Sequence, residues 1–187
     1  MHYNFSLPQE LQGKEQIIEY SKKYSYKEVK REKELIALAK NAKKRGYLLK
    51  NEFLELCVWK SPRPKKRFES NDEDVINYIT KTAFDANCPE SIRINILTLL
   101  NGVKHRVASA ILHMVCLEEG VSKDYPIMDF RALATLGYKM TDTDRRYEES
   151  EFWIEYTKYC RRVAQEYGVD LRTLDRALWQ YSKERGG

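Results

Sequence analysis

Apolar residues recur every three or four positions along almost the whole chain, a spacing typical of amphipathic helices. No stretch shows the strict alternation of a half-buried strand. Gly46, Gly120 and Gly137 are expected to end three of the helices, because glycine favours helix C-termini. The pattern predicts an all-α fold of roughly eight to ten helices, at residues 9–24, 27–45, 50–60, 71–86, 89–100, 104–119, 129–136, 148–167 and 171–184.

A short turn, "NGVK" (101–104), joins two of the most apolar predicted helices. Gly102 permits the tight backbone of such a turn. The first amides of the second helix carry partial positive charge and can bind a phosphate, which Lys104, His105 and Arg106 would surround. Contacts of this kind bind nucleic acid without reading its sequence. The alternative interpretation is a plain αα-hairpin with no ligand.

The segment "YPIMDFRALATLGY" (125–138) places an aspartate where a helix begins. Asp129 occupies the N-cap position, with Met128 and Leu133 spaced as a hydrophobic staple. Capping alone explains an isolated aspartate at such a position. The helix dipole and the backbone amides also keep a carboxylate ionised, so the same residue could serve as a catalytic anion.

Taken together, the hairpin and the aspartate resemble the helix-hairpin-helix (HhH-GPD) DNA glycosylase superfamily over roughly residues 90–138. Asp129 matches the catalytic aspartate of that family, at the start of the helix that follows a loop. Four residues match its hairpin: Leu100, Gly102, Val103 and Ala108. Two residues depart from its pattern: Asn101 stands where proline is usual, and Lys104 replaces the second glycine of the turn.

The resemblance implies an enzyme that flips a damaged or modified base out of double-stranded DNA and excises it. It implies Asp129 as the catalytic carboxylate, which stabilises an oxocarbenium-like sugar. Bifunctional members carry a lysine nucleophile at the position of Arg106, and arginine cannot form a Schiff base. The chain therefore resembles a monofunctional N-glycosylase, and the alternative is a catalytically inactive DNA-binding module. Sequence-independent contacts to the DNA backbone would come from Asn101, Gly102, Val103, Lys104, His105 and Arg106.

Charge is distributed unevenly along the chain. Residues 1–67 contain 17 Lys and Arg against 8 Asp and Glu, whereas residues 68–187 contain 16 against 20. A basic N-terminal third favours a polyanionic partner, although a solvated lysine-rich surface explains it equally well. The segment "WKSPRPKKRF" (59–68) adds Lys60 and Arg63, either as a second phosphate clamp or as a solvated connector.

Aromatic residues supply candidates for a base pocket, because unpaired bases stack on aromatic rings. The candidates are Tyr125, which is close to Asp129 in sequence, together with Trp59 and Trp153; core packing explains each of them as well. The last predicted helix, 171–184, has Leu171, Leu174, Leu178 and Tyr181 at core spacing and is expected to be structural, with Asp170 as its cap.

The 187 residues suffice for a single unit, which could also form two lobes at about 1–70 and 71–187. The four cysteines lie far apart in the sequence and the three histidines form no metal-binding pattern, so we expect reduced core thiols, no metal and no cofactor. The family's four-cysteine loop for an iron–sulfur cluster is also missing. No apolar run reaches the ~20 residues of a membrane span, and the N-terminus does not resemble a signal peptide. We therefore expect a cytoplasmic monomer.

Overall fold

The computed structural model describes residues 3–116, 125–138, 141 and 145–186, and every regular element in these ranges is helical. Two 3-10 helices, η1 (Gln9–Leu11) and η2 (Arg146–Glu148), accompany the α-helices. The α-helices are α1 (Lys14–Lys22), α2 (Tyr26–Arg45), α3 (Lys50–Lys60), α4 (Lys65–Glu69), α5 (Glu73–Phe84), α6 (Glu90–Leu97), α7 (His105–Cys116), α8 (Phe130–Thr135), α9 (Ser150–Tyr167) and α10 (Leu171–Glu184). The prediction of an all-α fold is confirmed.

Most helix positions agree with the spacing of apolar residues, and the differences occur at helix ends. The predicted first helix is divided, because η1 ends before Gly13 and α1 begins after it. The sequence did not predict α4, which is a single turn behind the prolines. Gly46 and Gly137 both follow helices and have positive φ angles of 88° and 83°, as C-terminal glycines do. The predicted helix end at Gly120 lies outside the described residues.

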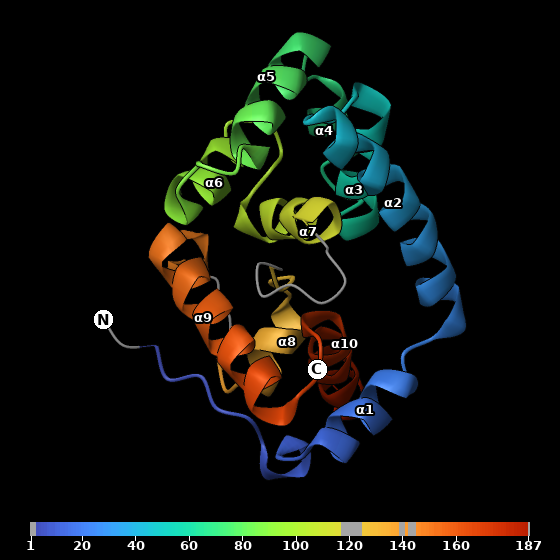
Figure 1. The fold of residues 1–187 in the computed structure, drawn as a ribbon, viewed down its shortest axis with the longest axis vertical. Helices are drawn as coiled ribbons and strands as arrows, with labels where there is room; N and C mark the ends of the chain where they lie inside the picture. Colours follow the sequence, from blue (N-terminus) through green and yellow to red (C-terminus); the bar gives the residue numbers. More distant parts are fainter. Residues whose placement is uncertain (1–2, 117–124, 139–140, 142–144, 187) are drawn as a thin grey trace.

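Helix α7 forms the centre of the molecule. Every residue from Val107 to Val115 is at most 5% exposed, and α2, α3 and α6 pack against this helix. In Figure 1 the other helices surround α7. This position agrees with its sequence, because apolar residues occupy most positions from Val107 to Val115.

The N-terminal part of the chain packs against its C-terminal part. Helix α1 lies against α10, and the extended segment before it places Phe5 against the rings of Phe152 and Tyr156 in α9. One cluster of buried apolar side chains includes residues from Leu11 to Tyr181. Residues 1–70 therefore share this cluster with the rest of the chain.

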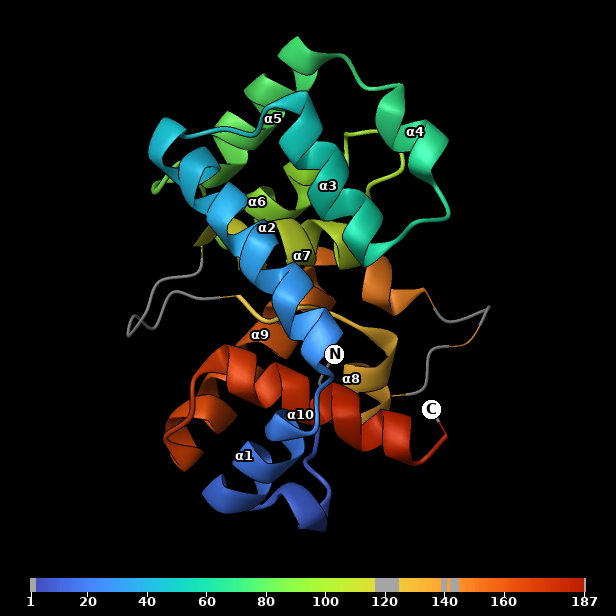
Figure 2. The same cartoon turned by 90° about the vertical axis from the view of Figure 1, so that its right-hand side faces the viewer.

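Helices α2, α3, α8 and α10 approach one another on one side of the molecule (Figure 2). This arrangement brings together residues that are far apart in the sequence. Within the described ranges, no helix has both the length and the apolar character that crossing a membrane requires.

Candidate functional site

The turn between α6 and α7 is held from behind by α4 and the residue that follows it. Gly102 has a φ of +86°, and a Cβ added there would lie 2.9 Å from Phe68 Cδ1. Asn71 completes the support, because its Nδ2 donates to the Asn101 carbonyl at 3.0 Å and its Oδ1 accepts from the Asn101 amide at 2.7 Å. Val103 is 4% exposed and anchors the turn to the core. Glycine is thus required both by the backbone conformation and by the close approach of Phe68.

The first amides of α7 have no partner within the described part of the chain. Among the described residues, the backbone N–H groups of Lys104, His105 and Arg106 have no hydrogen-bond partner. Lys104 is exposed, with its Nζ 2.5 Å from Glu148 Oε1. His105 is 7% exposed, and its Nε2 lies 3.0 Å from Asn95 Oδ1.

The proposed role of His105 as a phosphate-binding cation needs correction. Burial lowers the pKa of His105 below its usual value, and the carboxylates of Glu148 and Glu151 offset this only in part. The imidazole is therefore neutral at pH 7. Positive charge near the hairpin comes from Lys104 and Arg106.

Asp129 lies at the end of a buried segment that is tied to α7 and α9. Met128 donates its amide to Ser109 Oγ at 3.0 Å, and the Tyr156 hydroxyl donates to the Ile127 carbonyl at 3.1 Å. Asp129 Oδ1 accepts from the Arg131 amide at 3.0 Å, so the predicted N-cap is confirmed. The staple residues Met128 and Leu133 are also buried.

The second oxygen of the same carboxylate faces a buried lysine. Lys60 Nζ lies 2.5 Å from Asp129 Oδ2, and the two side chains are 8% and 14% exposed. Burial alone would raise the pKa of Asp129. The charge and hydrogen bond of Lys60, the Arg131 amide and the nearby Arg106 outweigh that effect and hold the pKa below its usual value. Asp129 is therefore ionised at neutral pH.

The prediction that Lys60 clamps a phosphate is wrong, because its amine is buried against Asp129 instead of exposed on the surface. Arg63 is exposed between α3 and α4, where a polyanion could reach it. The segment 59–68 thus has two parts with different environments. Its first residues end α3 at the carboxylate, and its last residues form α4 behind the hairpin turn.

A cavity of about 190 Å³ opens beside the Lys60–Asp129 pair. Its lining combines aromatic rings with charged groups from four parts of the chain. The end of α3, the N-cap of α8 and one face of α10 all contribute, as does the segment before α2. The lining residues are Tyr24, Trp59, Lys60, Ile127, Asp129, Arg172, Asp175 and Trp179.

Behind this cavity, a buried ion network joins α10 to α2. Glu32 is fully buried and accepts from Arg172 and Arg176, and Arg172 also pairs with Asp175. Burial raises the pKa of Asp175 to about 6, although the positive charge of Arg172 opposes the shift. The cavity therefore holds two carboxylates whose pKa values are shifted in opposite directions.

Two of the three predicted base-pocket residues do not line this cavity. Tyr125 and Trp153 are 5% and 0% exposed, and their rings stack in the core with centroids 5.2 Å apart. The Tyr125 carbonyl is 2.6 Å from His113 Nδ1. Of the three candidates, Trp59 alone lines the cavity, so Tyr125 and Trp153 are core residues. Sequence reasoning missed Trp179, Arg172 and Asp175, because they lie on a helix whose apolar spacing indicates only a structural role.

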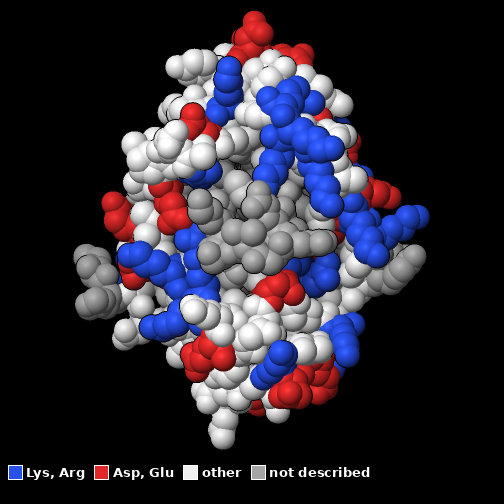
Figure 3. Space-filling view, in the orientation of Figure 1, with Lys and Arg blue, Asp and Glu red and all other residues white. Residues whose placement is uncertain are grey.

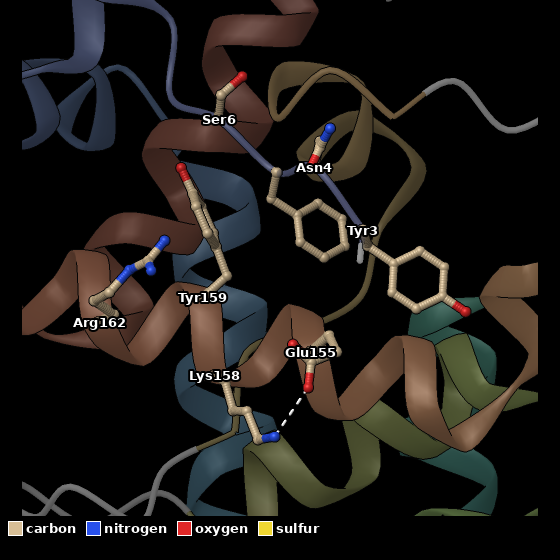
Figure 4. Close-up of a pocket in the computed structure, with 8 residues that line it drawn as sticks. Tyr3, Asn4, Ser6, Glu155, Lys158, Tyr159 and Arg162 are labelled. Carbon is tan, nitrogen blue, oxygen red and sulfur yellow. Dashed lines mark hydrogen bonds and ion pairs between the residues drawn. The ribbon is translucent and has the colours of Figure 1, made fainter. Parts of the chain in front are cut away.

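A larger groove of about 650 Å³ lies on another surface, between the N-terminal segment and α9. Figure 4 shows its lining, in which Glu155 is already paired with Lys158 at 2.9 Å. Burial raises the pKa of the Tyr159 hydroxyl to about 12. The one carboxylate that lines the groove, on Glu155, is 43% exposed, whereas the Asp129 side chain in the smaller cavity is 14% exposed.

No cluster of histidine, cysteine, aspartate or glutamate suited to a metal ion occurs among the described residues. All four cysteines lie in the described ranges, and none of them forms a disulfide bond there. Cys57 and Cys160 are buried core residues as predicted, whereas Cys88 and Cys116 are partly exposed. Comparison of the chain with family models, with curated proteins and with solved structures finds no match.

Proposed function

We propose that the protein is a monofunctional DNA N-glycosylase of the helix-hairpin-helix type, which excises a damaged or modified base from double-stranded DNA. The observation that carries this proposal is the position of Asp129. Its ionised carboxylate lines a cavity that also contains three aromatic rings, and Arg106, at the start of the helix that follows the hairpin turn, is close enough to lower its pKa. A carboxylate that only capped α8 would need neither the cavity nor the aromatic rings.

The chemistry follows from the charge of that carboxylate. Breaking an N-glycosidic bond builds positive character on the sugar, which an adjacent anion stabilises while it orients the attacking water. The flipped base would enter the cavity and stack on Trp59 and Trp179, which offsets part of the cost of leaving the duplex. Lys60 would keep Asp129 ionised and in place.

Binding to the DNA backbone would come from the hairpin. The free amides at the start of α7 would hold a phosphate, with Lys104 and Arg106 adding positive charge. The exposed lysines of α2, which include Lys33, Lys40 and Lys44, add to the basic surface seen over that helix in Figure 3. Contacts of both kinds recognise DNA without regard to its sequence.

A second candidate activity rests on Lys60. Its amine lies at the carboxylate, where in bifunctional members a lysine attacks the sugar and forms a Schiff base. We favour the hydrolytic reaction because an ammonium group paired with an ionised Asp129 has no lone pair for that attack. Arg106, at the hairpin position of the family's nucleophile, cannot perform it either.

The test is base excision from duplexes that each carry one deaminated, oxidised, alkylated or hypermodified base, detected as strand breaks after alkali. Asp129→Asn should reduce excision at least about 100-fold, the loss expected when one electrostatic contact to a transition state is removed. Asp170→Asn is the matched control, because Asp170 caps α10 through the Thr173 amide in the same way but lies outside the cavity. Asparagine and aspartate cap about equally well.

Circular dichroism should verify that both variants are folded at the assay temperature, since Asp129→Asn also leaves Lys60 without its partner. If the wild type excises a base and Asp129→Asn retains that activity, Asp129 is a structural cap. If no duplex is cleaved but DNA binding is retained, the protein is a catalytically inactive DNA-binding module.

A further inference from the structure

A row of alternating cations and aromatic rings connects the hairpin to the rim of the cavity. Arg106 of α7 lies 5.9 Å from the centre of the Phe130 ring, and Arg131 lies 5.1 Å from the centre of the same ring. Arg131 also stacks on Trp179 of α10 at 4.7 Å, and Lys183 lies 4.8 Å from the same ring. We call these five residues the cation–aromatic row.

The row lies on three helices that are adjacent in space. Helix α8 lies next to α10 and below α7 in both ribbon views (Figures 1 and 2). Phe130 follows Asp129 directly, and Trp179 lines the cavity. The row therefore begins at the helix that would hold a phosphate and ends where the flipped base would enter.

The exposure of the row differs from that of a core cluster. Phe130 is 42% exposed, although a buried position would stabilise its ring. Lys183 is exposed, and Arg106, Arg131 and Trp179 are partly exposed. Partly exposed rings beside cations are the features with which proteins bind unpaired nucleotides, because the rings stack on bases while the cations contact phosphates.

We propose that the cation–aromatic row binds unpaired nucleotides of DNA next to the flipped base, with Phe130 stacking on an exposed base. The identity of the ligand as DNA rests on the proposed function. The row would favour duplexes that are already opened over duplexes that are fully paired. Lys183 would extend the contact with the phosphates beyond the hairpin.

The experiment measures binding to two undamaged DNA probes of equal length by fluorescence anisotropy. One probe is fully paired, and the other contains three unpaired nucleotides in its centre; neither offers a base for excision. Phe130→Ala should weaken binding to the opened probe at least about fivefold, the lower limit for loss of one base–aromatic stack. Binding to the paired probe should change less than about twofold.

Matched variants separate stacking from a general loss of structure. Phe130→Trp should restore the preference for the opened probe, because it restores a ring. Tyr78→Ala removes a ring that is 73% exposed on α5, away from the row, and should change neither affinity. Lys183→Gln should make the salt dependence on the opened probe less steep by about 0.7 in the log–log slope, and Lys158→Gln on α9 should not.

Equal losses on both probes, no loss in Phe130→Ala, or the same loss in Tyr78→Ala would each overturn the proposal. These results do not depend on catalysis. If no base is excised but Phe130→Ala weakens binding to the opened probe as expected, the binding surface is supported and the proposed activity is refuted. If a base is excised through Asp129 but Phe130→Ala does not weaken binding to the opened probe, the activity is supported and the binding surface is refuted.

Discussion

Replacing Lys60 by methionine tests whether the ion pair at Asp129 is as buried as its geometry indicates. The structure contains a matched pair for comparison, because Lys104 and Glu148 are separated by the same 2.5 Å. The two pairs differ in exposure. The Lys60 and Asp129 side chains are 8% and 14% exposed, whereas those of Lys104 and Glu148 are 61% and 25% exposed.

This difference in exposure determines how much stability each lysine substitution is expected to cost. Removing one partner of a buried pair leaves an uncompensated charge and costs about 3–5 kcal/mol. We expect the lower end, about 3 kcal/mol, because the Arg131 amide still binds Asp129 and Arg106 remains nearby. For a chain of this size the melting temperature would fall by about 6–12 °C. Lys104→Met removes an exposed pair and should cost less than about 1 kcal/mol.

Urea unfolding of four proteins measures the interaction free energy between Lys60 and Asp129. The four proteins are the wild type, Lys60→Met, Asp129→Asn and the double variant. The double variant should be more stable than the sum of the single losses predicts, by about 1–3 kcal/mol. The pH dependence has a defined sign. Because the folded pKa of Asp129 lies below the usual value for aspartate, the stabilisation is complete above that usual value and is lost as the pH falls through the folded pKa.

The difference between wild type and Lys60→Met should therefore shrink in acid. Two results would show that the ion pair contributes nothing to stability. One is a Lys60→Met variant that is no less stable than Lys104→Met at pH 7. The other is a double variant whose loss of stability equals the sum of the two single losses.

Two further predictions concern the reaction and the hairpin. Borohydride should trap no covalent complex between the protein and DNA. An adduct that maps to Lys60 would show that the protein is a bifunctional glycosylase with lyase activity instead of a hydrolytic one. Gly102→Ala should lower the free energy of unfolding by about 1–3 kcal/mol, because a left-handed residue costs ~1–2 kcal/mol and its Cβ would press on Phe68; a variant as stable as wild type in urea would show that the turn can relax.

The helices could be predicted from the sequence because their apolar faces repeat over several turns. The single turn of α4 is too short for such a repeat, and prolines precede it. The N-cap at Asp129 was also predictable, because a cap is recognised by residues within a few positions of it. The DNA-binding and catalytic roles of the hairpin and the aspartate stay predictions that rest on resemblance.

The charge environment of Asp129 could not be predicted, because its partner lies 69 positions away in the sequence. A basic segment rich in proline indicates a solvated loop, and nothing in it marks Lys60 as the residue that turns inward. For the same reason, Asp129→Asn looks harmless to stability from the sequence, whereas the ion pair predicts a measurable loss. Arg172 and Asp175 of the cavity were missed because polar positions on a helix are ordinarily solvated.

Asp175 raises the question of why α10 buries a carboxylate that can cost stability. Its folded pKa of about 6 lies above the usual value of 3.8 for aspartate, so the fold favours the neutral acid. The corresponding stabilisation is complete below 3.8 and is lost as the pH rises through about 6, up to an upper limit of about 3 kcal/mol at 1.36 kcal/mol per unit.

Asp175→Asn cannot ionise, so its stability relative to wild type should increase between pH 4 and pH 6 and then stay constant, as measured by urea unfolding at each pH. A constant difference over that range would mean that Arg172 keeps Asp175 ionised throughout. If the increase is found, wild-type Asp175 reduces stability at neutral pH while its side chain lines the same cavity as Asp129. Such a cost is expected where a carboxylate serves a site and not the fold, because proteins depart from the most stable choice of residue mainly at functional positions.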